Sequence, residues 1–126
     1  MYYDLLTKIK NAQAVKMENV KSAYTEMDFV IAELLAKYKF IEEVSKKGRM
    51  PKRAMDVKLK YKDGKGAIQG VKFLSVPSRR LYIGYKEIKP VRQGYGLLVL
   101  STPKGIMDGK TAKKEKVGGQ LLFEIW

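Results

Sequence analysis

Hydrophobic residues recur at helical spacing in the first third of the chain. Asp4 can cap a first helix whose apolar residues fall on one side: Leu5, Leu6, Ile9 and Ala12. A second start signal is clearer, because Thr25 is followed by Asp28 at the spacing of a capping box. Behind it the helical period continues through Met27, Val30, Ile31, Leu34, Leu35 and Tyr38. We therefore predict two helices whose apolar stripes face a core.

The hydrophobic period then changes to two. Residues 40–44 are compatible with a strand, and residues 55–61 alternate between apolar and polar side chains. One buried face and one solvated face are typical of an antiparallel sheet. The segment between these strands is a basic loop, which we expect to be mobile in the free protein. Its cations are Lys46, Lys47, Arg49, Lys52 and Arg53.

Helical periodicity weakens after a turn at residues 62–65. Short strands are expected at 67–74, 81–85, 97–101 and 120–126, with one short helix at 110–116. The predicted fold class is α+β in two small subdomains. Residues 1–64 form a helix-bearing N-terminal subdomain, and residues 65–126 form a mostly β C-terminal subdomain.

Charge narrows the function. The chain has 126 residues and a formal net charge of +13, and 45% of its residues are hydrophobic, which favours a folded protein over a disordered polybasic tail. Such a positive excess is best tolerated beside a polyanion, because each neutralised phosphate releases counterions. Nucleic acid is the first candidate partner and an anionic membrane surface the second. A basic protein that binds neither is the remaining interpretation.

Several classes of site are excluded or disfavoured. The chain has no cysteine and no histidine, which excludes disulfides and metal sites built from thiolate or imidazole. We expect no metal, no cofactor and no small-molecule substrate. No targeting segment is visible, and the longest aliphatic run, 97–100, is too short for a membrane span. The second helix carries acids on its polar side, which does not suit a membrane surface. We expect a cytoplasmic location.

Two motifs imitate enzyme signatures. The segment from Gly105 to Thr111 has only three residues between its glycines, whereas a phosphate-binding loop needs four. A glycine-containing turn after a strand is the simpler interpretation. Ser101 and Lys104 fit a Ser-x-x-Lys nucleophile, but the partner elements of that chemistry are missing. No carboxylate pair stands out either, so we predict no catalytic residue and no enzyme.

RNA recognition fits the residues of the C-terminal half better than catalysis does. Specific RNA binding uses hydroxyls, backbone amides and flat side chains near loops, with cations on phosphates. Ser101 and Thr102 end an apolar strand, and Gly118-Gly119 permits close approach of another backbone. Charge and aromatic rings alternate at Arg79, Arg80, Tyr82, Tyr85 and Lys86. A core position is the alternative for Tyr82, and a solvated face is the alternative for the lysines Lys60, Lys62 and Lys65.

An ordered set of motifs runs along the chain. The set begins with the segments 4–12 and 40–41, and Ser75-Val76-Pro77-Ser78-Arg79-Arg80-Leu81-Tyr82 follows in the middle of the chain. The most specific part comprises Gly94-Tyr95-Gly96, then 100–108, then Gly118-Gly119-Gln120 and Trp126. Each motif alone is weak, but the ordered set covers essentially the whole chain and resembles the family of bacterial-type small-subunit ribosomal protein eight.

The resemblance implies two α+β subdomains and a primary binder of the central domain of small-subunit ribosomal RNA, which acts early in assembly beside neighbouring ribosomal proteins. It implies main contacts from Tyr82, Ser101, Thr102, Gly105, Gly118 and Gly119, and an N-terminal contribution from Thr7, Lys8, Lys10 and Asn11. We add Lys104, Gln120, Lys60 and Arg80 as candidate RNA contacts. Some family members also repress their own messenger RNA, which the sequence does not decide.

The chain departs from the family pattern in three places. Gln120 stands where the family often has glutamate, which removes a charge and adds a donor. Val76-Pro77-Ser78 replaces a common Lys-Pro-Gly, so one cation and one glycine are lost. Residues 20–24 replace a strand that contains Val-Pro in the family.

Overall fold

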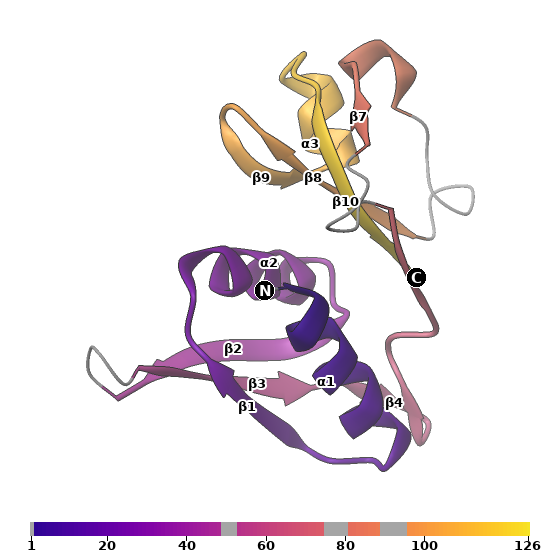
Figure 1. Cartoon of the computed structure of the whole chain (residues 1–126). Coiled ribbons are helices and arrows are strands. Elements are labelled where there is room, and N and C mark those ends of the chain that lie inside the picture. The colour runs from indigo at the N-terminus through magenta and orange to yellow at the C-terminus, as the bar shows by residue number, and fades with distance from the viewer. Residues whose placement is uncertain (1, 49–52, 75–80, 89–95) are drawn as a thin grey trace. The chain divides into compact units, whose positions relative to one another are not determined.

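The chain divides into two compact units, Met1–Ile68 and Gln69–Trp126. The computed structural model describes residues 2–48, 53–74, 81–88 and 96–126 (Figure 1). The division falls after residue 68, whereas the sequence suggested one after residue 64. Gln13 explains the difference, because its side-chain amide donates to the Ile68 carbonyl at 2.5 Å and accepts from the Ile68 amide at 3.1 Å. Residues 66–68 are thereby held in the first unit.

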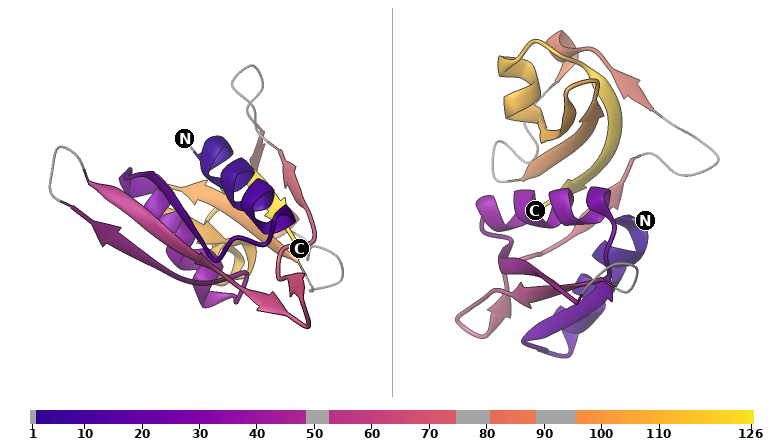
Figure 2. Two further views of the ribbon diagram at one scale, coloured as in Figure 1. Left: turned by 90° about the horizontal axis from the view of Figure 1, so that it is seen from below. Right: turned by 90° about the vertical axis from the view of Figure 1, so that its left-hand side faces the viewer.

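The first unit combines two helices with a three-stranded antiparallel sheet of order β1-β3-β2 in the described residues. Its elements are α1 (Tyr2–Ala14), β1 (Asn19–Ala23), α2 (Glu26–Lys37), β2 (Ile41–Lys47), β3 (Ala54–Leu59), β4 (Tyr61–Lys62) and β5 (Lys65–Gly66). The helix α2 packs along β2, and α1 packs on β1 and α2 (Figures 1 and 2).

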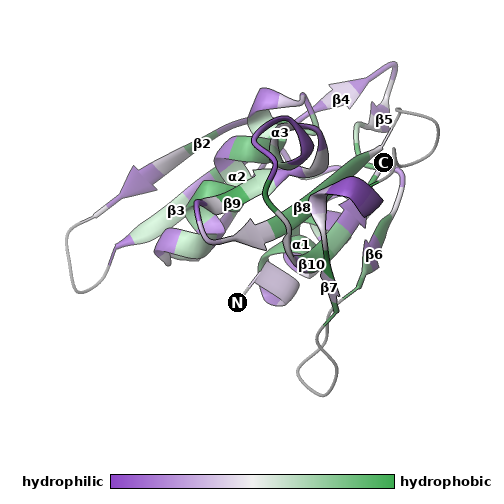
Figure 3. Cartoon of the chain, turned by 90° about the horizontal axis from the view of Figure 1, so that it is seen from above, coloured by the Kyte–Doolittle hydropathy of each residue, from purple (hydrophilic) through white to green (hydrophobic). Residues whose placement is uncertain are grey.

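The predicted alternation of β3 is confirmed. Met55, Val57 and Leu59 are buried, whereas Lys58 is exposed and Asp56 is half-buried. Figure 3 shows the same alternation as green and purple steps along β3. The helices supply the rest of this core with residues that include Leu5, Ile9, Ile31 and Leu35. The apolar stripes of both predicted helices therefore face the core, as expected.

The helix starts differ in how well the sequence predicts them. The Thr25 hydroxyl accepts from the Asp28 amide at 3.1 Å, so the predicted cap of α2 is confirmed. The predicted cap at Asp4 is wrong, because α1 already begins at Tyr2. Tyr2 is buried and extends the helix by anchoring its first turn in the core. Asp4 lies in that turn, where the helix dipole favours a carboxylate.

The basic loop begins later than expected. Lys46 and Lys47 lie in β2, and Lys47 forms an ion pair of 2.9 Å with Asp56 of β3. Arg49 and Lys52 lie outside the described residues. The expected turn at 62–65 joins β4 to β5, with φ of 53° at Asp63 and 77° at Gly64. Two positive φ values in succession match the tight hairpin turn that Asp-Gly favours.

The second unit places α3 on one face of a five-stranded sheet in the described residues (Figure 2). Its elements are β6 (Val71–Phe73), β7 (Tyr82–Ile83), the 3-10 helix η1 (Tyr85–Glu87), β8 (Leu97–Thr102), β9 (Gly105–Asp108), α3 (Gly109–Lys114) and β10 (Gly119–Ile125). The strands follow the order β6-β10-β8-β9, and β7 also pairs with β10. The predicted strands and short helix are present, but the strands expected at 67–74 and 81–85 are shorter than predicted, and β9 and η1 were not anticipated.

The face of this sheet beneath α3 is apolar. Leu98 and Leu100 are buried there against Ala112 of α3 and Ile88. Further side chains that pack on this cluster are Leu74, Ile83, Tyr85, Met107, Val117 and Leu121. The fold class is thus α+β, with helices mainly in the N-terminal part and strands dominant in the C-terminal part. No helix of the described chain is long and apolar enough to cross a membrane.

Candidate nucleic-acid interface

Three candidate positions form one row with Ile106 across four adjacent strands of the second unit. Gln120 of β10 pairs with Tyr82 of β7 on one side and with Ser101 of β8 on the other. Ser101 in turn pairs with Ile106 of β9. Directly opposed residues of antiparallel strands project from the same face. We call Tyr82, Gln120, Ser101 and Ile106 the cross-strand row.

The cross-strand row lies on the face opposite to α3. Its members alternate along their strands with Ile83, Leu121, Leu100 and Met107, which all pack on the cluster beneath α3. Successive side chains of a strand point to opposite faces. The row therefore presents a phenol, an amide and a hydroxyl on the helix-free side of the sheet.

Tyr82 is the most exposed member of the row. Its residue surface is 69% exposed, so the core interpretation of this tyrosine is wrong. Ser101, Gln120 and Ile106 are half-buried. An exposed aromatic ring beside hydrogen-bonding side chains can stack on a base while its neighbours read polar edges or ribose hydroxyls.

The paired glycines allow the strands at this end of the sheet to lie close together. A Cβ on Gly119 would lie 2.1 Å from the Ser101 carbonyl oxygen, and one on Gly118 would lie 2.3 Å from the Ile83 carbonyl oxygen. The backbones that approach these glycines closely are thus those of β7 and β8. The pair is required for the packing of β10, and this packing brings Gln120 level with Ser101 and Tyr82.

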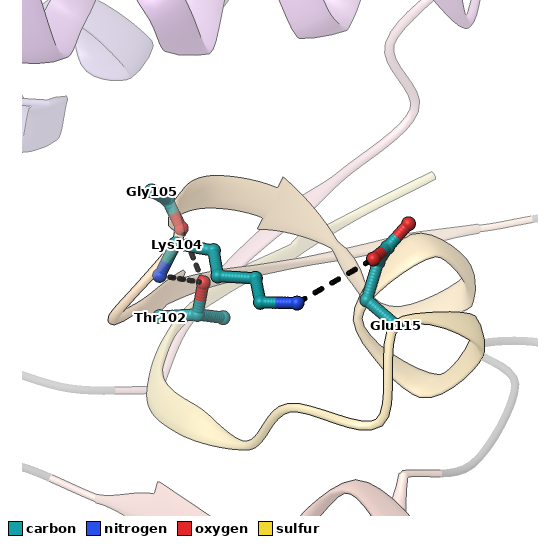
Figure 4. Close-up of polar contacts among 4 residues, drawn as sticks. All are labelled: Thr102, Lys104, Gly105 and Glu115. Atoms are coloured by element: carbon teal, nitrogen blue, oxygen red, sulfur yellow. Dashed lines mark hydrogen bonds and ion pairs between the residues drawn. The ribbon is translucent and has the colours of Figure 1, made fainter.

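The turn from β8 to β9 is closed by Thr102 (Figure 4). The hydroxyl of this buried threonine donates to the Gly105 carbonyl at 2.7 Å and accepts from the Lys104 amide at 3.2 Å. Gly105 has a φ of +118°, which favours glycine at this position. Thr102 therefore uses its single donor within the turn, and it shapes the turn beside the row.

Lys104 extends from the tip of this turn toward α3. Its ammonium lies 3.7 Å from the Glu115 carboxylate, and both side chains are about half exposed (Figure 4). Exposed pairs of this kind contribute little to stability, about 0–1 kcal/mol. Lys104 can accordingly exchange Glu115 for a phosphate at small cost.

The enzyme-like motifs have structural explanations. Residues 105–108 form the extended strand β9, so this segment does not curl around a phosphate as a phosphate-binding loop does. The Asp108 carboxylate accepts from the amide and the hydroxyl of Thr111 and thereby caps α3. The described residues contain no group of three or more acidic, histidine or cysteine side chains that could hold a metal ion.

The N-terminal candidates form a separate group on α1 in the first unit. Thr7, Lys8, Lys10 and Asn11 are all exposed. Residues three or four positions apart are neighbours on a helix surface, which places these four on one polar side of α1. The core-facing residues Leu6 and Ile9 hold the helix in place.

The remaining candidates are less closely connected to the row. Lys60 is half-buried between β3 and β4, and its carbonyl accepts from the Ala67 amide at 3.0 Å. Lys62 and Lys65 are exposed register partners in the first unit. Arg80, together with Arg79, the motif residues 75–78 and Gly94-Tyr95, lies outside the described residues.

Reasoning from the sequence missed two features. Ile106 joins the row because the unexpected strand β9 pairs with β8. The lysines of α3 were not among the candidates, although the run from Lys110 to Lys116 is plain in the sequence. The strand register decides which residues join the row, and the packing of α3 on the sheet decides which of its lysines face solvent. A single sequence does not reveal either.

The chain is similar to known proteins over nearly its whole length. A model of the family "Ribosomal protein S8" matches residues 2–126. The chain belongs to this family. Small ribosomal subunit protein uS8 of Nitratidesulfovibrio vulgaris (strain DP4) is 40% identical over 123 residues, covering 98% of this chain and 94% of that protein. Small ribosomal subunit protein uS8c of Tupiella akineta is 42% identical over 125 residues, covering 98% and 95%.

A third relative extends the comparison. Small ribosomal subunit protein uS8 of Vesicomyosocius okutanii is 38% identical over 123 residues and covers 98% of this chain and 94% of its own length. The similarity therefore spans both structural units. Proteins of this family are structural, non-enzymatic components of the ribosome. This agrees with our prediction that the chain is not an enzyme.

Proposed function

We propose that the cross-strand row and the adjoining β8–β9 turn bind the central domain of small-subunit ribosomal RNA. Membership of the ribosomal protein S8 family makes the chain a structural protein of the small ribosomal subunit. The finer role proposed here is primary binding of this RNA domain and an early part in subunit assembly, at the ribosome in the cytoplasm.

The observation that carries the proposal is the alignment of Tyr82, Gln120 and Ser101 on one helix-free face. RNA recognition by a sheet commonly combines an aromatic stacking surface with polar groups that read the unstacked base. Gln120 supplies both a donor and an acceptor, and Ser101 supplies a hydroxyl. The row thus places a stacking ring and hydrogen-bonding groups at directly paired positions of adjacent strands.

Charge supports the same proposal. The net charge of +13 attracts a polyanion, and Lys104 stands at the tip of the turn beside the row. The exposed group on α1 gives the first unit its own lysines for phosphate contact. Neighbouring ribosomal proteins would complete the environment. If its own messenger RNA carried a hairpin that imitates the ribosomal site, that hairpin would bind to the same surface, and the chain would then repress its own messenger.

The proposal is tested by salt-dependent binding to a central-domain rRNA fragment, with a scrambled helix of equal length as competitor. We expect tight binding that survives the competitor. Ser101→Ala should lower the affinity by about 1–3 kcal/mol if it loses a hydrogen bond to RNA. Ser45→Ala, at an exposed serine of β2 in the first unit, is the matched control and should bind as the wild type does.

Either of two results would contradict the proposal. If both RNAs lost binding equally as salt rises, the protein would act only as a generic polycation. If Ser101→Ala and Ser45→Ala bound equally well, the row would not be the recognition surface. Circular dichroism of each variant shows whether a weaker binder is still folded.

A further inference from the structure

The outer surface of α3 carries a second concentration of positive charge. Lys110, Lys113, Lys114 and Lys116 are all exposed. The nearest acids in sequence are Asp108, which is buried as the cap of α3, and Glu115, which lies near Lys104. Lys110, Lys114 and Lys116 form no ion pair with any residue that the structure describes.

This surface and the cross-strand row face opposite ways. Ala112 packs on the apolar face of the sheet, and Lys110 and Lys114 flank it in sequence on the solvent side of α3. Lys110 and Lys114 are four residues apart and are therefore neighbours on the helix. The row projects from the other face of the sheet, so its side chains and these lysines point in opposite directions.

Stability of the helix does not explain Lys110. It lies in the first turn of α3, which contains no acidic residue, and the helix dipole disfavours a cation at that end. The Asp108 carboxylate already caps the start of this helix by accepting hydrogen bonds from the amide and the hydroxyl of Thr111. A neutral residue at position 110 would stabilise the helix at least as well. The positive charge of Lys110 therefore calls for an explanation other than helix stability.

Lys116 is held against its backbone preference. It has a φ of 58°, directly after the helix, where glycine is the favoured residue. The surrounding hydrogen bonds, from the Lys116 amide to the Lys113 carbonyl and from the Val117 amide to the Ala112 carbonyl, describe an ordinary helix termination. A left-handed lysine costs about 1 kcal/mol relative to glycine, and its cation adds to the same exposed surface.

We propose that Lys110, Lys114 and Lys116 bind the phosphate backbone of a second RNA segment, so that the C-terminal unit bridges two RNA segments from opposite faces of one sheet. This inference rests on the proposed RNA binding by the row. The exposed side chains that define this surface are lysines, which suit phosphates rather than bases. Lysine is depleted in protein–protein interfaces, so an acidic protein is the less fitting partner.

The test uses two RNAs. The full chain is first saturated with the central-domain rRNA fragment, and a short RNA duplex of unrelated sequence is then titrated in. We expect a ternary complex whose formation depends on salt. Lys110→Gln/Lys114→Gln should reduce the slope of log affinity for the duplex against log salt by about two units, roughly one for each lysine that no longer binds a phosphate. Binding of the first fragment should remain unchanged.

Charge and shape are separated by two further variants. Lys110→Arg/Lys114→Arg keeps the charges and should restore the salt slope. Lys116→Gly should raise the melting temperature while it weakens duplex binding. Lys39→Gly is the matched control, because Lys39 follows α2 with a φ of 66° and the same hydrogen-bond pattern. It should stabilise the protein without changing duplex binding.

The outcomes distinguish the two proposals. Failure of the first fragment to bind would overturn the proposed function. Normal binding of that fragment with no ternary complex, or with a duplex slope unchanged by Lys110→Gln/Lys114→Gln, would overturn the bridging proposal alone. Equal weakening by Lys39→Gly would also overturn it, since the effect would then be one of net charge. If an acidic peptide displaced the duplex and bound more tightly, a protein partner would replace RNA.

Discussion

Ser101 and Gln120 lie directly opposite each other on β8 and β10, and their side chains share the helix-free face of the sheet. Antiparallel partners have Cβ atoms about 4.5–5.5 Å apart, so one nucleotide can contact both side chains. Gly119 makes this pairing possible, because a Cβ there would meet the Ser101 carbonyl oxygen. The two polar groups are therefore neighbours on the proposed RNA-binding surface.

Their proximity predicts energetic coupling. We expect Ser101→Ala and Gln120→Ala each to weaken binding to the central-domain fragment, and the double variant to lose less than the sum of the two. Contacting residues in one network typically couple by about 0.5–3 kcal/mol. A double-mutant cycle on the binding constants measures this value. Strict additivity would mean that the two side chains contact separate parts of the RNA.

The exposed ring of Tyr82 predicts a change in binding without a change in stability. Tyr82→Ala should leave the free energy of unfolding nearly unaltered, because the side chain is largely in solvent. Loss of base stacking should weaken RNA binding by about 1–3 kcal/mol. Tyr82→Phe keeps the stacking surface and should bind nearly as the wild type does. An equal loss in both variants would assign the effect to the hydroxyl instead.

Two glycines close to the row predict opposite outcomes for the same substitution. Gly119→Ala should destabilise the second unit by about 1–3 kcal/mol, because the new methyl group overlaps the backbone of β8. Gly84 precedes η1 with a φ of −83° and has open space around its missing Cβ. Gly84→Ala should therefore be neutral or slightly stabilising. Urea unfolding of both variants checks the pair.

The sequence predicts those parts of the fold that depend on local patterns. Thr25 with Asp28 identified the start of α2, and the alternation of residues 55–61 identified the two faces of β3. The start of α1 was missed because burial of Tyr2 in tertiary packing extends the helix beyond the local signal at Asp4. Local signals do not contain that contact.

The candidate site shows the same division. Ser101 was recognised from its place at the end of an apolar strand, and the glycine pair from its permissive backbone. The sequence could not show that Thr102 turns inward or that β9 brings Ile106 beside Ser101, because both depend on the pairing of β8 with β9. Long-range register, rather than residue type, decides which polar groups lie on the proposed RNA-binding surface.

Burial of Tyr2 predicts a loss of stability at high pH. Burial, together with the neighbouring Tyr3, raises the pKa of the Tyr2 phenol above its ordinary value of 10.0. The folded state then keeps a proton that the unfolded state releases, so the free energy of unfolding falls as pH rises above 10. Tyr2→Phe should flatten this decline. Denaturant melts at pH 8 to 11, at about half-unit steps, compare the two slopes.

The inward hydroxyl of Thr102 predicts that this residue acts on RNA through the shape of the turn. Thr102→Val keeps the volume but removes the bonds to the Gly105 carbonyl and the Lys104 amide, so it should cost about 1–2 kcal/mol of stability. Thr102→Ser keeps the hydroxyl and should restore both stability and binding. Amide hydrogen exchange of Lys104 should quicken in the valine variant before RNA is added. If exchange stayed slow while RNA affinity fell, the hydroxyl would contact RNA directly.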